Sequence, residues 1–376
     1  MAVDPGLLSL PLWVNEPLKP YTTFKVGGPA RSFIPARSID QVRFGLAFAG
    51  KQNLPLFVLG GGSNILVSDR GFAGKVLHPV FQGKWPALED AECVTLEVNT
   101  GEAWDELVRF AVENGWWGIE NLSHIPGQAG AALVQNIGAY GQQVSDVVQS
   151  AEVVEVATLR TRVLSAADCE FGYRRSIFNS TARGQFIIVR LTLRLTKEGR
   201  PQLDYPDVKA YFQERGVTQP SLSEIRQAII SIRDCKFPFP REERGGNAGS
   251  FFKNLSLLET EYAMLHDNVR RNFPPPVLAR LEEVRNRFPA VNRIKIPTAF
   301  LIEICGLKGE RIGGAEVNEA QPLVLINQGG ATAHDVLALA RHVRRTVHQR
   351  TGMVIAIEPE LVGFSPPELE DFHKLE

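Results

Sequence analysis

Three glycine-rich segments lie within the first 141 residues, and they constrain the fold more than any other feature of the chain. They span residues 27–28, 60–64 and 126–141. The second segment follows a short apolar run at 54–59, which predicts a buried strand ending in a turn. Consecutive backbone N–H groups in glycine turns form concavities that bind anions, because no Cβ keeps the anion away. One such segment alone is usually a tight turn, but three together favour a site for a phosphate-bearing ligand.

None of these segments fits the common nucleotide-binding loops. No Gly-Lys-Ser/Thr sequence follows any of them, which excludes a Walker A loop. Gly60 and Gly62 match the first two positions of the GxGxxG fingerprint, but Ile65 occupies the third. A Rossmann nicotinamide domain is therefore disfavoured, and we expect any dinucleotide to be held by several loops of a different fold.

Composition narrows the class of protein further. The chain has 376 residues, 44% of them hydrophobic and 22% charged, which is typical of a globular protein of roughly two to three domains. The formal net charge of -1 gives no overall basic excess of the kind that is typical of nucleic-acid binders, which leaves only a local basic patch open. The four cysteines form no CxxC pair and the histidines no HExxH pattern. Neither a disulfide framework nor a metal site is expected.

The apolar runs and the first residues bear on localisation. No apolar run approaches the roughly 18 residues that cross a bilayer. Asp4 stands where a signal peptide carries a basic residue, and Pro11 interrupts the first apolar stretch. We therefore expect a cytoplasmic protein with no membrane insertion and no nucleic-acid partner.

Hydrophobic periodicity predicts helices and strands without regular alternation, which indicates an α+β fold. Strands are expected at 54–59, 65–67, 94–98, 153–164, 186–195 and 353–357, and helices at 102–113, 221–232, 276–288 and 332–351. Capping boxes support two of the helices: Ser221 with Glu224, and Thr332 with Asp335. The expected organisation is an extension at 1–15, a lobe at 16–200, a linker at 201–218, a second lobe at 219–363 and a tail at 364–376.

Several motifs resemble those of the UDP-N-acetylenolpyruvoylglucosamine reductase family. The most specific are QNIGAYG at 135–141, YRRSIF at 173–178 and GNAGSFFKN at 246–254. Further matches run in the family's order from about residue 15 to 363 and include LGGGSNILV, IENLSHIPG, LIEICGLKGERIGGAEV and IEPEL. The segment LDYPDV, which contains Tyr205, resembles the family's longer type.

The resemblance implies a fold and a cofactor. The first lobe would be an FAD-binding domain of the vanillyl-alcohol oxidase type, with two α+β subdomains that divide near residue 80. The second lobe would be an α+β substrate-binding domain whose last strand carries Glu360. The implied FAD contacts are Gly60, Gly61, Gly62, Ser63, Asn64, Pro126, Gly127, Gly130, Gln135, Asn136, Gly138, Ala139, Tyr140 and Gly141. Neither GGGSN nor QNIGAYG contains a His or Cys, so the FAD is expected to be non-covalent.

The resemblance also implies a reaction in peptidoglycan synthesis, and through it roles in cell-wall biogenesis, cell shape, the cell cycle and cell division. NADPH would reduce the FAD, and the flavin N5 hydride would pass to the vinyl carbon of UDP-N-acetylglucosamine-enolpyruvate, giving UDP-N-acetylmuramate. Arg174 would stabilise the enolate, and Ser250 would deliver the proton. Glu360 would hydrogen-bond the enolate or orient the network around Ser250, if burial keeps it protonated. Without the motifs, these residues would be taken for a surface arginine, a helix cap and a solvated acid.

Five more residues match the family's substrate-binding positions: Tyr173, Tyr205, Lys236, Asn254 and Gln321. Lys236 would meet the UDP diphosphate as a point charge, and Tyr205 would close over the nucleotide. No second nucleotide-binding fold is visible in the sequence. NADPH and the UDP-sugar are therefore expected to use one cleft in turn, in a monomeric protein.

Two other functions remain open from the sequence. An FAD oxidase of the same fold would prefer dioxygen as acceptor and would not use a UDP-sugar. A nucleotide-sugar binding protein without activity would have lost catalytic positions, whereas Arg174, Ser250 and Glu360 are all present. Departures from the family's pattern at Gln128 and Leu255 affect loop geometry and leave these three residues in place.

Overall fold

The computed structural model describes residues 11–51, 54–236, 239, 245–287 and 293–375. The chain divides into two compact units, each built from separate stretches of sequence. Unit 1 contains the residues up to Glu16, Ala30–Gly61 and Ala73–Cys235, and unit 2 contains Pro17–Pro29, Gly62–Phe72 and Lys236–Glu376. This division differs from the expected lobes in three places. Two short early segments belong with the C-terminal unit, and the expected linker at 201–218 belongs with unit 1. Residues 219–235, expected in the second lobe, also belong with unit 1.

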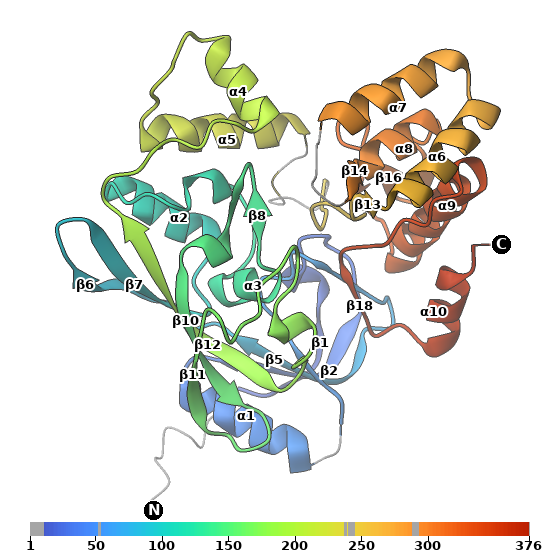
Figure 1. The fold of residues 1–376 in the computed structure, drawn as a ribbon. Helices are drawn as coiled ribbons and strands as arrows, with labels where there is room; N and C mark the ends of the chain where they lie inside the picture. The colour runs from blue at the N-terminus through green and yellow to red at the C-terminus, as the bar shows by residue number, and fades with distance from the viewer. Residues whose placement is uncertain (1–10, 52–53, 237–238, 240–244, 288–292, 376) are drawn as a thin grey trace, which may run out of the picture. The chain divides into compact units, whose positions relative to one another are not determined.

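The first sheet has four strands, in the order β1 (Trp13–Pro17), β2 (Pro29–Ala36), β5 (Phe72–Pro79) and β3 (Leu56–Val58). Helix α1 (Ile39–Lys51) runs between β2 and β3 in the chain (Figure 1). Val42 and Leu46 of α1 belong to an apolar cluster with residues of β2 and β5. The same cluster includes Ile187 from the second sheet, so the two sheets share a core.

The second sheet has five antiparallel strands, in the order β11 (Thr161–Ser165), β10 (Val148–Glu155), β12 (Phe186–Thr196), β7 (Cys93–Asn99) and β6 (Lys84–Glu89). Alternate residues of β7 are buried, as a half-buried strand requires. They share a core with α2 (Trp104–Glu113) and α3 (Ala129–Val134). The predicted strands at 94–98 and 186–195 and the helix at 102–113 are confirmed, with ends that differ by at most two residues.

The single strand predicted at 153–164 is wrong, because the region forms a hairpin. β10 ends at Glu155, and β11 pairs with it antiparallel from Thr161. The Leu159 N–H donates to the Glu155 carbonyl at 2.8 Å, and Leu159 has a φ of 59°. The reversal was missed because residues 156–160 contain neither glycine nor proline, so the apolar pattern continues through the turn.

Two helices, α4 (Pro206–Gln213) and α5 (Leu222–Lys236), pack together in unit 1 (Figure 1). Their apolar cluster also includes Tyr140, which is why the expected linker belongs with this unit. The predicted capping box before α5 is present. The Glu224 N–H donates to Ser221 Oγ at 3.3 Å, and Glu224 Oε2 accepts the Ser221 N–H at 2.8 Å.

Short elements complete unit 1 and part of unit 2. They are the two-residue strands β8 (Gly138–Ala139) and β9 (Gln142–Gln143) and the 3-10 helices Lys19–Tyr21, Glu120–Leu122, Val144–Asp146 and Ile177–Asn179.

Unit 2 packs helices around small sheets. Its helices are α6 (Glu259–Asn272), α7 (Pro275–Arg287), α8 (Thr298–Ile304), α9 (Ala333–Thr351) and α10 (Pro366–His373). Its strands are β4 (Ile65–Val67), β13 (Leu255–Leu257), β14 (Ile294–Ile296), β15 (Arg311–Ile312), β16 (Ala315–Val317), β17 (Leu325–Asn327) and β18 (Glu360–Val362). The helices predicted at 276–288 and 332–351 are confirmed as α7 and α9. No helix in the described ranges is both long and apolar enough to span a bilayer.

The early segment Gly62–Phe72 joins unit 2 through two sets of contacts. β4 pairs in parallel with β18, which carries Glu360. The carboxylate of Asp69 accepts the N–H groups of Ala333 and His334 at 2.8 and 2.9 Å, at the start of α9. The strand predicted at 353–357 is wrong, because that stretch has a single bridge, from Ile357 to Phe252, and the ladder begins only at β18.

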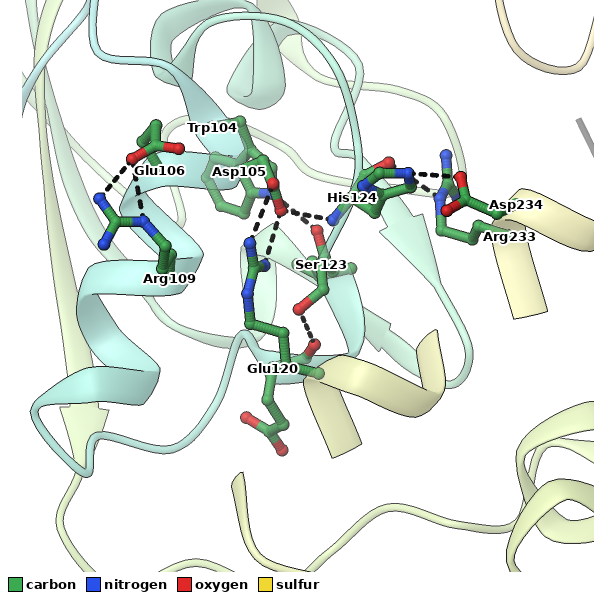
Figure 2. Close-up of polar contacts among 11 residues, drawn as sticks. Trp104, Asp105, Glu106, Arg109, Glu120, Ser123, His124, Arg233 and Asp234 are labelled. Carbon is green, nitrogen blue, oxygen red and sulfur yellow. Dashed lines mark hydrogen bonds and ion pairs between the residues drawn. The ribbon is translucent and has the colours of Figure 1, made fainter. Parts of the chain in front are cut away.

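An ion pair fixes α5 to α2 within unit 1. Asp105, in the first turn of α2, accepts hydrogen bonds of 2.7 and 3.0 Å from Arg226 and one of 2.6 Å from the His124 N–H. Burial alone would raise the pKa of Asp105, but these hydrogen bonds hold that pKa below its ordinary value. The next residue, Glu106, pairs instead with the exposed Arg109 (Figure 2).

Asp105→Asn is expected to lower the free energy of unfolding at pH 7 by about 1.5–3 kcal/mol, since Arg226 loses its charged acceptor. Glu106→Gln removes only an exposed pair and should cost less than about 1 kcal/mol. Because folding depresses the pKa of Asp105, its contribution is present above roughly pH 4 and is lost as the pH falls through the folded-state pKa. Urea unfolding at several pH values measures both variants. Equal losses of unfolding free energy in the two variants, or a loss in Asp105→Asn that persists at acidic pH, would contradict this role of Asp105.

Candidate functional site

Gly60 and Gly61, the first two residues of the GGGSN segment, pack closely against residues 127–131 in unit 1. A Cβ on Gly61 would lie 2.5 Å from the Cα of Gly127, and one on Gly60 would lie 2.7 Å from the Cβ of Ala131. Side chains do not tolerate such distances, so both positions require glycine. Gly127 has a φ of 122°, which glycine adopts readily. Glycine turns of this kind can offer backbone N–H groups to a pyrophosphate, such as the one that FAD carries.

The remaining residues of GGGSN lie in unit 2. Gly62 has a φ of 61°, and its carbonyl accepts the Thr23 N–H at 3.1 Å. The carbonyl of Asn64 accepts the Glu360 N–H at 3.0 Å, and its side-chain amide donates to the Glu358 carbonyl at 3.4 Å. The predicted phosphate segment is therefore hydrogen-bonded to the strand that carries Glu360.

The QNIGAYG loop has an unusual backbone. Asn136 and Tyr140 have φ values of 42° and 48°, a region that residues other than glycine rarely enter. The side chain of Asn136 donates to the Gly172 carbonyl at 2.9 Å and accepts the Ser145 N–H at 3.1 Å. Burial raises the pKa of Tyr140 to about 12, so its hydroxyl stays protonated at neutral pH. Gly138 lies between the two strained residues.

Arg174 rests on this loop. Its Nη2 donates to the Gly138 carbonyl at 2.9 Å, and its own φ is 54°. Its guanidinium lies 5.4 Å from the ring centre of Tyr173, which is 68% exposed. The structure thus brings one predicted catalytic residue to the loop predicted to hold the flavin.

Ser250 and Glu360 lie on adjoining segments of unit 2. The Glu358 N–H donates to the Phe251 carbonyl at 2.9 Å, next to Ser250. Phe251 is fully buried, which fixes this junction in the core of the unit. Glu360 is exposed among the described residues, so the burial that the sequence predicts for it is not seen there.

The predicted substrate-binding residues lie in several places. The Tyr205 ring packs edge-on against the Tyr140 ring, with centres 5.2 Å apart. Lys236 ends α5, and its carbonyl accepts a hydrogen bond of 2.8 Å from the Asn318 side chain. Asn254 Oδ1 accepts the N–H of the first residue of α8 at 3.1 Å, which gives Asn254 a structural role as well. Gln321 stands in a turn before β17, where its carbonyl accepts a backbone N–H at 2.9 Å.

Sequence reasoning missed a polar network around His124 in unit 1. His124 contacts Arg233 and Asp234 there, with Asp105 adjoining (Figure 2). Arg226 pairs in turn with Asp105. The available signal was the spacing of Arg226 and Arg233, which lie seven residues apart and so share one face of a helix. Within the described ranges, no group of three or more His, Cys, Asp or Glu side chains could hold a metal ion.

Two protein-family matches cover most of the chain. Residues 240–362 match the family described as UDP-N-acetylenolpyruvoylglucosamine reductase, C-terminal domain, and residues 30–160 match an FAD binding domain. The predicted α+β fold, with an FAD-binding domain followed by a C-terminal domain, is therefore confirmed.

Curated relatives are similar over nearly their whole length. The UDP-N-acetylenolpyruvoylglucosamine reductase of Flavobacterium johnsoniae is 35% identical over 349 residues, which are 93% of this chain and 98% of the relative. That of Pseudomonas putida is 39% identical over 345 residues, 92% of this chain and 97% of the relative. A solved structure, UDP-N-acetylenolpyruvylglucosamine reductase from Thermus caldophilus, has a TM-score of 0.60 at 23% identity and covers 94% of this chain and 99% of that chain. At this identity the structural match supports the fold alone.

Gly61→Ala is expected to weaken FAD binding by about tenfold or more, because the added methyl group must displace the backbone at Gly127. Gly50→Ala is the matched control, since a Cβ at Gly50 meets no atom within 4 Å. Quenching of flavin fluorescence on binding measures the dissociation constant of both variants. An unchanged constant in Gly61→Ala would show that this contact does not shape the cofactor site.

Proposed function

The chain belongs to the UDP-N-acetylenolpyruvoylglucosamine reductase family and is an FAD-dependent oxidoreductase, and we propose that it carries out the reaction that the family's name describes. The proposed substrate is UDP-N-acetylglucosamine-enolpyruvate, and the proposed product is UDP-N-acetylmuramate for peptidoglycan synthesis. NADPH is the proposed hydride donor. The proposed setting is the cytoplasm, where the product would serve cell-wall growth, cell shape and division.

The observation that carries the proposal is the geometry of Arg174. Its guanidinium lies against the Gly138 carbonyl, in the loop proposed to hold the flavin ring. A guanidinium at that position can pair with the substrate carboxylate and stabilise the negative charge that grows as the double bond is reduced. An oxidase acting on a neutral alcohol would have no carboxylate for Arg174 to bind, so this residue favours the reductase.

Bound non-covalently, FAD would supply the hydride-transfer chemistry. The glycine surface formed by Gly60, Gly61 and Gly127 would hold its pyrophosphate, and residues 135–141 would line its ring system. Lys236 would meet the diphosphate of the UDP-sugar, and Tyr205 would cover the nucleotide. We propose that NADPH and the UDP-sugar occupy the same site in turn on a monomer.

Ser250 is the proposed proton donor. Gly249 precedes it with a φ of 67°, and the Asn247 side chain accepts the Gly249 N–H at 2.9 Å, so a defined turn presents the Ser250 hydroxyl. A hydroxyl is a weak acid, so transfer of the proton from Oγ depends on the basicity of the substrate carbanion. Glu360 is proposed to orient this hydroxyl, because its segment adjoins that of Ser250, or to donate a hydrogen bond to the enolate in its protonated form.

An anaerobic absorbance experiment tests the proposed function directly. We expect a flavin band near ~450 nm that NADPH bleaches and that returns promptly when UDP-N-acetylglucosamine-enolpyruvate is added. A protein that bleaches but responds only to dioxygen would overturn the substrate assignment in favour of an oxidase. A colourless protein that FAD does not reconstitute would favour a nucleotide-sugar binding protein.

Ser250→Ala is expected to slow reoxidation of the reduced flavin by the UDP-sugar by about 10²–10⁴-fold, because the carbanion loses its proton donor. Reduction by NADPH should keep its rate, since Ser250 has no role in that half-reaction. Ser256→Ala, at an exposed serine of β13, is the matched control. Stopped-flow measurement of the two half-reactions separates the effects, and equal slowing of both would assign Ser250 to cofactor binding instead.

A further inference from the structure

A network of polar contacts holds the turn at His124 from several sides (Figure 2). His124 is buried and has a φ of 62°. Its N–H donates to Asp105 at 2.6 Å, its Nε2 donates to Asp234 at 2.8 Å, and its carbonyl accepts a hydrogen bond of 2.9 Å from Arg233 Nε. The last turns of α5 are therefore joined to the start of α2 through a single strained residue.

Arg233 extends this network to the QNIGAYG loop. It donates a side-chain hydrogen bond to the hydroxyl of Tyr140. The Tyr140 side chain is buried, and its backbone carbonyl accepts a hydrogen bond of 2.8 Å from the Asn121 side chain. Tyr140 is thus held at both its hydroxyl and its backbone, which supports the rare φ that it adopts.

Two residues of the proposed site depend on the position of Tyr140. The carbonyl that receives Arg174 belongs to Gly138, two residues before Tyr140 in the same turn. The ring of Tyr205 packs on the ring of Tyr140. A shift of Tyr140 would therefore move the acceptor of Arg174 and the platform of Tyr205 together.

We propose that Arg233 is a positioning residue for the reduction, which holds the Tyr140 hydroxyl and so fixes the turn that supports Arg174 and Tyr205. Burying a guanidinium is costly, and burial does lower the pKa of Arg233. Tyr140 and the carboxylates of Asp105 and Asp234 oppose that shift. Arg226 lies seven residues before Arg233 on α5. Its hydrogen bonds run to Asp105 of α2 rather than to the QNIGAYG loop. The expected change in the rate of reoxidation rests on the proposed function, whereas the expected change in the flavin spectrum does not.

The test compares Arg233→Met with Arg226→Met in the FAD-loaded protein. Both variants lose a partly buried arginine of α5, so both should unfold at lower temperature. Only Arg233→Met is expected to change the flavin absorption spectrum and to slow reoxidation by the UDP-sugar, by roughly 10- to 100-fold. Arg233→Lys should restore part of the rate, because it can still donate to the Tyr140 hydroxyl.

Tyr140→Phe supplies a second, independent measurement that stands even where Arg233→Met does not fold. It keeps the ring against Tyr205 and removes only the hydroxyl that Arg233 binds. Tyr140→Phe should by itself shift the flavin spectrum and slow reoxidation by roughly 10- to 100-fold. Where Arg233→Met folds, the two single variants should match, and the double variant should be no slower than the slower single one. Additive losses in the double variant, or equal effects of Arg226→Met and Arg233→Met, would overturn the proposal. If the wild type itself fails to reoxidise with the UDP-sugar, the proposed function falls, whereas the spectral comparison still decides the role of Arg233.

Discussion

The close approach of Gly61 to the backbone at Gly127 is the contact that positions the flanking loops of unit 1. Apolar cores accept exchanges of similar volume, because neighbouring side chains can repack. A contact between two backbones has no side chain that can adjust, so a single added carbon must move the chain itself. α3 begins two residues after Gly127, and the QNIGAYG loop follows directly after α3. The position of that loop therefore follows from a contact made at glycine.

Four residues other than glycine adopt positive φ close to the proposed site: His124, Asn136, Tyr140 and Arg174. Each such conformation costs about 1–3 kcal/mol and persists only where surrounding contacts enforce it. Here hydrogen bonds from side chains to backbone carbonyls provide that enforcement, from Arg174 to Gly138 and from Asn136 to Gly172. The strain is thus distributed over a connected set of loops, which is typical of a site whose polar groups must point in fixed directions.

Sequence alone predicted the elements and motifs whose causes are local. The Ser221–Glu224 cap lies within four residues, and the alternation of β7 lies within seven, so both were visible in the sequence. The motif around Arg174 was visible as well, but its contact with Gly138 was not, because 36 residues separate the two partners. The network around His124 was missed for the same reason: its members come from α2, a turn and α5, and only the fold brings them together.

Unit 2 draws its strands from distant parts of the chain, since β4 at 65–67 pairs with β18 at 360–362. On a ribosome, β4 emerges long before β18, because the two paired strands lie far apart in the sequence. The edge of β4 that β18 later covers must remain unpaired throughout that interval, and unpaired strand edges favour association with other chains. The ladder between β4 and β18 can therefore form only after the intervening chain, which includes Ser250, has been made.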